Sequence, residues 1–285
     1  MFTEQKQEKY TKIKLEGELS LEKTFDCGQA FRFEKVESAR HGHEFSGVAY
    51  GRHVSFAQEG NELYIYGADE EDFENIWRRY LGLDTDYEKI NADILSRSDN
   101  PALKNALEFG RGIRILRQEP WEAVCSFIIS QNNNIPRIKK IIRAMSEKYG
   151  THLGGDNYAF PTAKALHEAG EAELFALKTG FRAKYLADAS ARFVDGRLDL
   201  EKINEIPSTA ECVKKLCEVK GIGPKVASCA LLFGFGRLDA FPVDVWIRRV
   251  MEKYFDPDFD IAQLGPYAGV AQQYLFYYER YLGGE

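Results

Sequence analysis

Long apolar runs and an excess of positive charge are both missing from this sequence of 285 residues. No stretch of about eighteen or more apolar residues occurs, so we expect no membrane-spanning helix. The opening "MFTEQKQEKY" lacks the cationic start and apolar block of a secretory signal. These absences indicate a soluble protein that stays inside the cell.

Paired cysteines are also missing. The five cysteines are an odd number, widely scattered in a chain that is too large to need disulfides, so we expect reduced thiols. No two of them form a CxxC pair, which leaves a zinc ribbon, a thioredoxin-type site and a cysteine-ligated iron–sulfur cluster without ligands. We therefore expect no metal held by side chains.

The net charge of −6 argues against a strongly basic nucleic-acid-binding protein, but the distribution of charge matters more than its sum. Residues 111–150 carry eight basic and three acidic side chains, whereas residues 1–110 carry 14 basic and 22 acidic ones. A basic band therefore lies inside an acidic protein.

Spacing of apolar residues predicts an α+β fold. Short runs at 31–36, 44–50, 53–57 and 63–67 alternate as strands do, with a hairpin loop at 58–62. Residues 69–83 place an apolar stripe on one helix face, formed by Phe73, Ile76, Trp77, Tyr80 and Leu81.

From about residue 100 onward nearly every segment has helical spacing. The sequence thus predicts an N-terminal antiparallel β domain with flanking helices over residues 1–105, followed by a mainly α-helical domain over residues 106–285. The glycine-rich "THLGGDNY" at 151–158 is interpreted as a connection where one helical lobe ends.

Two helices joined by "GIG" are predicted over about 208–235. Ser208 and Glu211 have capping-box spacing, and Pro224 suits the first turn of the second helix. Gly221 and Gly223 let the backbone approach a ligand closely, and the free N–H groups of the second helix would suit a phosphate. An ordinary helix connection with a C-cap glycine is the alternative.

Lys225 stands in the first turn of this second helix, where the dipole disfavours a cation. Dipole and burial would both lower its pKa from roughly 10.4, and a neutral amine is a nucleophile. Lys225, Cys229 and Phe233 share one helix face by their spacing. Asp244 precedes the next helical pattern, where it could cap that helix, face Lys225, or do both.

The stretches "VKGIGPKVASC" (219–229) and "AFPVDV" (240–245) resemble the helix-hairpin-helix DNA glycosylase superfamily, also called HhH-GPD. The stretches "DCGQAFRF", "SFIISQNNNIPRI", "GFRAKY" and "AQQYLF" extend the resemblance to the 8-oxoguanine DNA glycosylase/AP lyases, over roughly residues 20 to 280. It implies a bifunctional DNA repair enzyme that flips out and excises 8-oxoguanine through a lysine Schiff base and then nicks the strand by β-elimination.

The resemblance implies a role for each residue at the reacting nucleotide. Lys225 would attack the sugar and Asp244 would stabilise the developing cation. The Gly28 carbonyl would recognise the protonated N7 of 8-oxoguanine, and Gln272 would read the Watson–Crick edge. Cys229 and Phe276 would hold the base between them; without the resemblance, Phe276 would be a core residue.

It also implies contacts to the rest of the duplex. Asn132 would fill the vacated stack, while Arg137 and Arg182 would bind the orphaned cytosine. The alternatives are that Asn133 and Asn134 only shape a turn and that Arg137 contacts a phosphate.

Two positions depart from the eukaryotic pattern. Phe181 stands where those relatives carry a tyrosine wedge, and Trp246 where they carry a histidine. The opposite-base preference and some phosphate contacts are therefore left open.

By the same resemblance, the backbone carbonyls of Cys217, Val219 and Ile222 match a structural site for K⁺ or Ca²⁺, with no cofactor required. The expected partner is double-stranded DNA containing 8-oxoguanine. The protein is expected to act as a monomer and not to associate with a membrane. The expected location is the cytoplasm or nucleoid of a prokaryote, or the nucleus of a eukaryote.

Three rival readings remain. An endonuclease III-like glycosylase would normally carry a four-cysteine cluster after the catalytic helix, and no cysteine follows Cys229. An alkylation-repair glycosylase generally lacks the hairpin lysine. A non-catalytic helix-hairpin-helix DNA-binding protein would not need Lys225 and Asp244 together.

Overall fold

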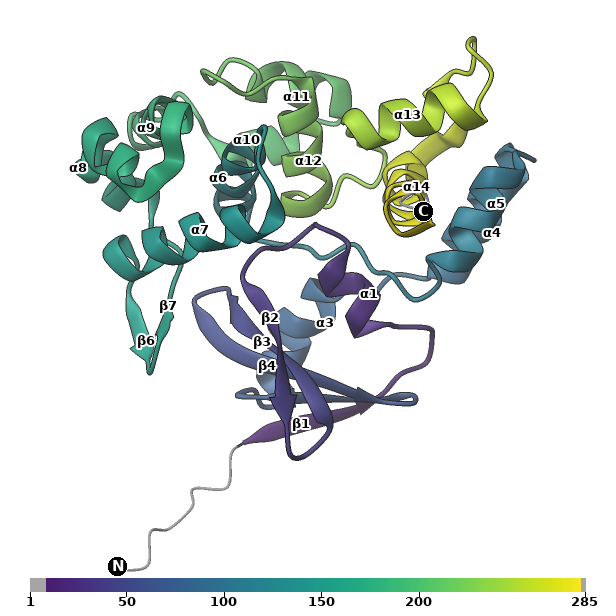
Figure 1. The fold of residues 1–285 in the computed structure, drawn as a ribbon, viewed down its shortest axis with the longest axis horizontal. Helices are drawn as coiled ribbons and strands as arrows, with labels where there is room; N and C mark the ends of the chain where they lie inside the picture. The colour runs from purple at the N-terminus through teal and green to yellow at the C-terminus, as the bar shows by residue number, and fades with distance from the viewer. Residues whose placement is uncertain (1–8, 283–285) are drawn as a thin grey trace, which may run out of the picture.

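A five-stranded antiparallel sheet lies beneath a larger helical body in the computed structural model, which describes residues 9–282 (Figure 1). The strand order is β1-β5-β4-β3-β2. The strands are β1 (Tyr10–Lys14), β2 (Phe33–Ser38), β3 (Gly42–Ala49), β4 (Arg52–Glu59) and β5 (Glu62–Tyr66). The α+β fold class is confirmed.

Four of the strands are those that the alternating runs predict, and the turn between β4 and β5 falls at Gly60, whose φ is +58°. The edge strand β1 has no counterpart among the predicted runs. Its sequence "YTKIK" carries two lysines, and charged side chains are common on edge strands because they discourage pairing with another chain. Its Thr11 is buried and donates to the Ala68 carbonyl at 3.1 Å.

Aromatic rings fill the core between the sheet and its helices. Phe25 comes from α1 (Leu21–Asp26) and stacks on Phe45 and Phe56, with ring centroids 5.3 and 5.8 Å apart. Trp77 and Tyr80 are buried in the same core. They lie on a helical run made of α2 (Glu70–Asp72), η1 (Phe73–Trp77) and α3 (Arg78–Tyr80).

The helix predicted over 69–83 therefore exists, but its middle is a π turn. Asp69 caps it, and its side chain and that of Asp72 each accept a hydrogen bond from the other's backbone. The predicted apolar stripe is buried except Ile76, which is partly exposed.

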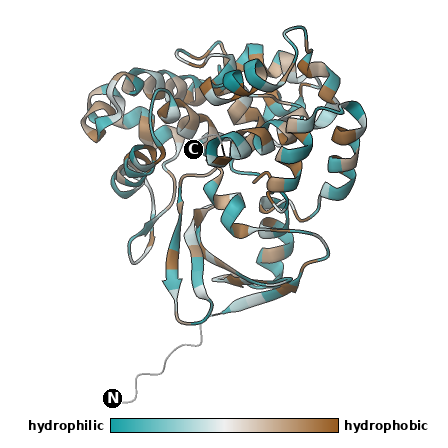
Figure 2. Ribbon diagram, turned by 45° about the vertical axis from the view of Figure 1, so that its right-hand side comes forward, coloured by the Kyte–Doolittle hydropathy of each residue, from teal (hydrophilic) through white to brown (hydrophobic). Residues whose placement is uncertain are grey.

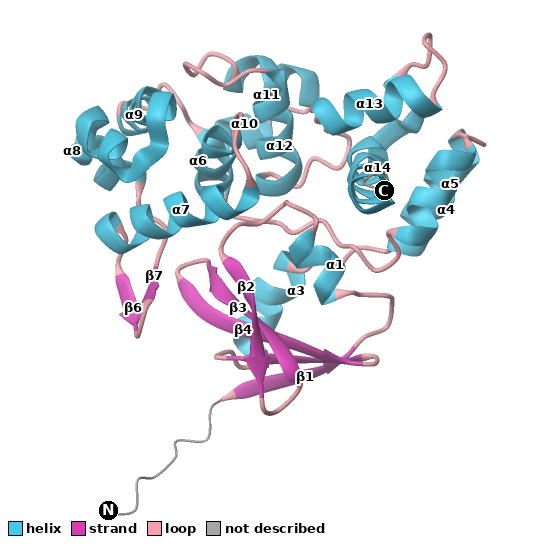
Figure 3. Ribbon diagram, in the orientation of Figure 1, coloured by secondary structure: helices cyan, strands magenta, loops and turns pink. Residues whose placement is uncertain are grey.

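Helices make up most of the rest of the chain (Figure 3). They are α4 (Tyr87–Arg97), α5 (Pro101–Phe109), α6 (Pro120–Ser130), α7 (Ile135–Tyr149), α8 (Ala163–Leu174), α9 (Ala183–Val194), α10 (Leu200–Glu205), α11 (Thr209–Leu216), α12 (Pro224–Gly234), α13 (Val245–Tyr254) and α14 (Ala268–Leu282), with short turns η2 (Phe175–Thr179), η3 (Gly180–Arg182) and η4 (Ile261–Tyr267). Hydrophobic and hydrophilic residues alternate along the helices, as they do in amphipathic elements (Figure 2). None of the helices in residues 9–282 is long and apolar enough to cross a membrane.

The glycine-rich connection at 151–158 forms a small hairpin of β6 (His152–Gly154) and β7 (Asn157–Tyr158). This hairpin follows the end of α7 and lies beside the main sheet (Figure 1). The Tyr158 carbonyl accepts a hydrogen bond from Arg32, so the hairpin is tied to the segment that leads into β2.

The predicted helix pair is formed by α11 and α12. Ser208 caps α11 by accepting from the Glu211 N–H, although the reciprocal half of the capping box is absent. Pro224 is the first residue of α12, as predicted. Gly221 has φ +83°, and a Cβ there would lie 2.2 Å from the Tyr185 ring, so both conformation and space require glycine.

Candidate active site

A cavity of about 920 Å³ opens where six parts of the chain meet. They are the turn after α1, the loop between α6 and α7 with the helix ends beside it, η3, α12, the start of α13, and α14. Ten of the predicted site residues line this cavity: Gly28, Asn132, Phe181, Gly223, Lys225, Cys229, Asp244, Trp246, Gln272 and Phe276. Arg137, Arg182 and Gly221 lie outside it.

Lys225 is the second residue of α12 and is half-buried. Its Nζ lies 5.9 Å from the centroid of the Phe127 ring, which stacks on Phe233 at 5.3 Å. Lys225, Cys229 and Phe233 all line the cavity, which confirms the shared helix face inferred from their spacing. The amine is thus presented beside an apolar, flat-walled space.

Asp244 caps α13, because its Oδ1 accepts from the Ile247 N–H at 2.8 Å. The predicted cap is confirmed, and Asp244 also lines the same cavity as Lys225. No ion pair joins Asp244 to Lys225 within the part of the chain that the structure describes. The N-termini of α12 and α13 therefore bring an amine and a capped carboxylate to the same cavity, where these two groups do not form a direct ion pair.

The Cys229 thiol is sensitive to both of these charges. Burial raises the pKa of Cys229 to about 11, the positive charge and hydrogen bonding of Lys225 oppose the rise, and the negative charge of Asp244 adds to it. Cys229 is therefore a neutral, buried thiol at physiological pH. Its place in this site is that of a small apolar wall rather than of a nucleophile.

The opposite wall comes from the turn at Gly28 and from α14. Gly28 has φ +77°, and a Cβ there would lie 3.6 Å from Cε1 of Phe276. Gln272 is only 4% exposed, and its Oε1 has no hydrogen-bond partner among residues 9–282. A buried amide oxygen without a partner costs free energy, so Gln272 is suited to a ligand that supplies a donor.

The three asparagines of the "QNNN" loop between α6 and α7 have different surroundings. Asn133 donates to the Ile129 carbonyl at 3.0 Å, and Asn134 caps α7 by accepting from the Arg137 N–H at 3.0 Å. Both therefore shape the turn, as the alternative reading held. Asn132 is exposed at the cavity with φ +46°, a conformation that asparagine tolerates better than most residues.

The two predicted cytosine-binding arginines differ in their surroundings. Arg182 is 2% exposed and donates to the backbone carbonyls of Gln131, Asn132 and Thr179, so its guanidinium holds the loop. Burial lowers its pKa. Arg137 is exposed, and within residues 9–282 its guanidinium donates only to the Lys178 carbonyl, at 3.3 Å.

The two residues that depart from the eukaryotic pattern lie at the rim. Phe181 is 46% exposed, with the Arg182 guanidinium 4.4 Å from its ring centroid. Trp246 is half-buried in the first turn of α13, and the Arg249 guanidinium lies 5.4 Å from its ring. Both offer flat apolar surfaces next to the cavity.

Phe127 and Gln273 also line this cavity, and neither is among the site residues that the sequence predicts. Phe127 faces Lys225 from α6, but it stands in the apolar run "CSFIIS" and nothing distinguishes it from core residues. Gln273 is 2% exposed and donates to the Cys27 carbonyl at 2.8 Å. Two adjacent polar residues interrupt the apolar pattern "GVAQQYLF", which marks Gln273 as unusual but does not show which backbone group it contacts.

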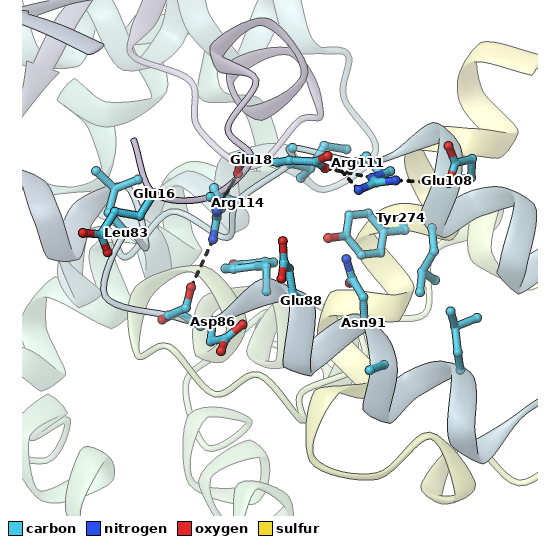
Figure 4. Close-up of a pocket in the computed structure, with 18 of the residues that line it drawn as sticks. Glu16, Glu18, Leu83, Asp86, Glu88, Asn91, Glu108, Arg111, Arg114 and Tyr274 are labelled. Atoms are coloured by element: carbon cyan, nitrogen blue, oxygen red, sulfur yellow. Dashed lines mark hydrogen bonds and ion pairs between the residues drawn. The ribbon is translucent and has the colours of Figure 1, made fainter. Parts of the chain in front are cut away.

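A second cavity, of about 700 Å³, lies on another face of α14 (Figure 4). Tyr274 lines it, with Arg111 bridging Glu18 and Glu108, and Glu88 pointing into the space. Acidic side chains outnumber basic ones in this lining, which is unfavourable for a phosphate backbone. No group of three His, Cys, Asp or Glu side chains in residues 9–282 could hold a metal ion, here or elsewhere.

Comparisons with known proteins match both halves of the chain. A family model described as the N-terminal domain of 8-oxoguanine DNA glycosylase matches residues 12–124, and one described as HhH-GPD superfamily base excision DNA repair protein matches residues 125–259. An N-glycosylase/DNA lyase of Arabidopsis thaliana is 31% identical over 281 residues, covering 93% of this chain and 75% of that protein.

Solved structures agree. The apo 8-oxoguanine glycosylase/lyase of Clostridium acetobutylicum has a TM-score of 0.87 and 40% identity, covering 95% of this chain and 97% of that one. The same enzyme in complex with double-stranded DNA containing cytosine opposite 8-oxoguanine has a TM-score of 0.85 and 39% identity, covering 96% of this chain and 98% of that one.

Proposed function

Because the chain belongs to the 8-oxoguanine DNA glycosylase family of the HhH-GPD superfamily, we propose that it is a DNA repair glycosylase and AP lyase. It flips 8-oxoguanine out of duplex DNA, excises it and nicks the strand. The observation that carries this proposal is the meeting of Lys225 and Asp244, each on a helix N-terminus, at one cavity with flat apolar walls.

The reaction begins with the Lys225 amine. A bond forms between its Nζ and C1′ as the bond from C1′ to the base breaks, and the base leaves with the electron pair and takes up a proton. Asp244, held in place by its cap on α13, stabilises positive charge at the sugar. The Lys225 nitrogen then loses a proton, and the C1′–O4′ bond breaks as O4′ takes up a proton, which gives a Schiff base. Loss of a C2′ proton forms a C2′–C3′ double bond, breaks the C3′–O bond and expels the 3′ phosphate.

Recognition of the base depends on a proton at N7. In 8-oxoguanine N7 carries a hydrogen and donates to the Gly28 carbonyl, whereas N7 of guanine is an acceptor and leaves that carbonyl unpaired. An unpaired buried group costs about 1–3 kcal/mol. Gln272 pairs with the Watson–Crick edge, and the base lies between Cys229 and Phe276.

Flipping leaves a gap that the protein must fill. Asn132 enters the vacated stack from its exposed position, and Phe181 wedges beside it. Arg137 reaches the unpaired cytosine directly. Arg182 contributes to the same recognition by holding the carbonyls of the loop that carries Asn132.

The hairpin between α11 and α12 binds the phosphate backbone through its N–H groups at Gly221 and Gly223. K⁺ or Ca²⁺ fits beside it, because the carbonyls of Cys217 and Ile222 accept no hydrogen bond from the described residues. The Val219 carbonyl accepts from the Ile222 N–H at 3.0 Å and keeps a second lone pair. Such a cation would supply positive charge for a phosphate, while the sugar chemistry needs no cofactor.

The protein acts as a monomer inside the cell, where its DNA substrate is. The compartment is the nucleoid or cytoplasm in a prokaryote and the nucleus in a eukaryote. With Phe181 and Trp246 at the rim, its preference for the opposite base is best measured with all four bases opposite the lesion.

Borohydride trapping tests the proposed chemistry. Incubation with a duplex containing 8-oxoguanine opposite cytosine and with borohydride is expected to give a covalent protein–DNA adduct, which Lys225→Gln abolishes. Duplexes containing an oxidised pyrimidine or undamaged guanine serve as controls. An adduct that persists in Lys225→Gln overturns the assignment of Lys225 as the nucleophile. An adduct that forms only with the oxidised pyrimidine favours the endonuclease III-like alternative.

A further inference from the structure

Three consecutive backbone carbonyls lie in the turn after α1, and buried glutamine amides hold the outer two. Gln273 Nε2 donates to the Cys27 carbonyl at 2.8 Å, and Gln118 Nε2 donates to the Gln29 carbonyl at 2.7 Å. The middle carbonyl, that of Gly28, accepts no hydrogen bond from the described residues. One acceptor on the cavity wall is therefore left for a ligand.

The turn is also fixed from within. Gln29 is fully buried; its Nε2 donates to the carbonyls of Thr24 and Arg114 at 2.8 Å, and its Oε1 accepts from the Leu116 N–H at 2.8 Å. These bonds tie the turn to the extended segment before α6. Gln273 ties the turn to α14 on the cavity side, while Arg280 and Tyr281 of α14 donate to Asp26 at the end of α1.

The burial of Gln273 indicates that its hydrogen bond to the turn has a role. Gln273 is 2% exposed, and a buried amide on a helix costs free energy that an apolar side chain would not. Its neighbour Gln272 lines the same cavity, so α14 carries one glutamine with an unpartnered oxygen and one whose amide is committed to the turn. The helix that bears the proposed base-reading residue is thereby locked to the turn that bears the proposed N7 acceptor.

We propose that Gln273 is a positioning residue for base selection: by holding the Cys27 carbonyl, it keeps the adjacent Gly28 carbonyl from turning away from N7 of the flipped base. The proposal rests on the proposed function. A fixed Gly28 carbonyl disfavours guanine because the carbonyl oxygen faces the N7 lone pair and stays without a hydrogen bond. A mobile Gly28 carbonyl would rotate away from N7 and so reduce that free-energy cost.

Substitution Gln273→Met tests this, because methionine has nearly the same length and volume but no donor. The readout is the ratio of single-turnover excision rates for 8-oxoguanine and guanine, both opposite cytosine. We expect this ratio to fall about tenfold, equivalent to about 1.4 kcal/mol. The lyase rate on a preformed abasic site, which requires no base reading, should stay within about twofold of wild type.

Tyr274→Phe is the matched control. Tyr274 is the next residue on α14, is equally buried, and lines the second cavity instead. Its substitution removes one polar group from the same helix and should leave the ratio unchanged. Gln118→Met supplies a second test of the idea from the other side of the turn, with the same expected fall in the ratio.

The outcomes separate the two levels of proposal. A wild-type protein that does not excise 8-oxoguanine overturns the proposed function. Wild-type selectivity that survives in folded Gln273→Met and Gln118→Met variants overturns the positioning role alone. Equal losses on 8-oxoguanine, guanine and the abasic site also overturn it, because they would mark these glutamines as merely structural.

Discussion

Asp244 shows how one carboxylate can serve folding and chemistry together. Its Oδ1 accepts from the Ile247 N–H and so satisfies one of the free donors at the start of α13. The same side chain lines the cavity beside Lys225. Since the cap needs only an oxygen acceptor and the chemistry needs a negative charge, the two roles can be separated by substitution.

Replacing Asp244 by asparagine keeps the cap, because asparagine and aspartate are about equally good at this position. We expect Asp244→Asn to unfold in urea within about 1 kcal/mol of wild type, with loss of the helix-dipole interaction alone. Asp244→Ala loses the cap and should cost about 1 kcal/mol more. Both variants should reduce the single-turnover excision rate about 10² to 10³-fold. Full activity of Asp244→Asn would leave this residue as a cap only.

At the scale of elements, the sheet and the helical body meet at a buried ion pair. Arg32, just before β2, lies 3.4 Å from Glu122 in the first turn of α6, and each side chain is 9% exposed. Burial raises the pKa of Glu122 to about 7, the Arg32 charge opposes this, and the nearby Glu119 adds to it. Burial therefore outweighs the pairing.

The raised pKa of Glu122 determines the direction in which stability changes with pH. Between the ordinary carboxyl pKa of 4.5 and about 7, the folded protein holds a proton that the unfolded chain has lost. The stability contributed by Glu122 is thus full below pH 4.5 and falls as the pH rises to about 7. From pH 5 to pH 8 the free energy of unfolding should drop by about 2 to 3 kcal/mol more in wild type than in Glu122→Gln. Urea unfolding of both proteins at the two pH values measures this, and parallel changes would contradict it.

Elements and caps followed from local rules, which is why they were predictable. Alternation gave four strands, and the 3.6-residue period placed Lys225, Cys229 and Phe233 together. Asp244 as a cap needed only its position before an apolar helix. The π turn at 73–77 was not predictable, because its apolar stripe fits an α-helix equally well.

Contacts between side chains and distant backbone groups had no such local signal. The resemblance assigns Arg182 to DNA, yet in the folded chain it donates to the Thr179 carbonyl and to two carbonyls about fifty residues away. Gln273 holds a carbonyl 246 residues away. Which carbonyls need a donor depends on how the whole chain packs, and one sequence does not contain that information in local form.

At the scale of the whole molecule, the basic band of residues 111–150 is mostly paired with acidic side chains. Ion pairs join Arg111 to Glu18, Arg117 to Asp84, Lys139 and Arg143 to Glu34, and Lys148 to Glu173. Arg137 and Lys140 have no ion-pair partner within residues 9–282. The charge available for phosphates is therefore concentrated near the start of α7, beside the Asn132 loop, rather than spread over the band.

Salt dependence of DNA binding tests this concentration of charge. Each phosphate neutralised by the protein contributes about 0.9 to the slope of log affinity against log salt concentration. In a Lys225→Gln background, which prevents turnover, Arg137→Ala should lower the slope by about one. Arg143→Ala is the matched control: it removes an arginine from the same helix that already pairs with Glu34 at 3.5 Å, and should change the slope little. Fluorescence anisotropy between about 50 and 200 mM salt measures both. Equal changes in the two variants would mean that the band acts through its total charge, and that the ion pairs open when DNA binds.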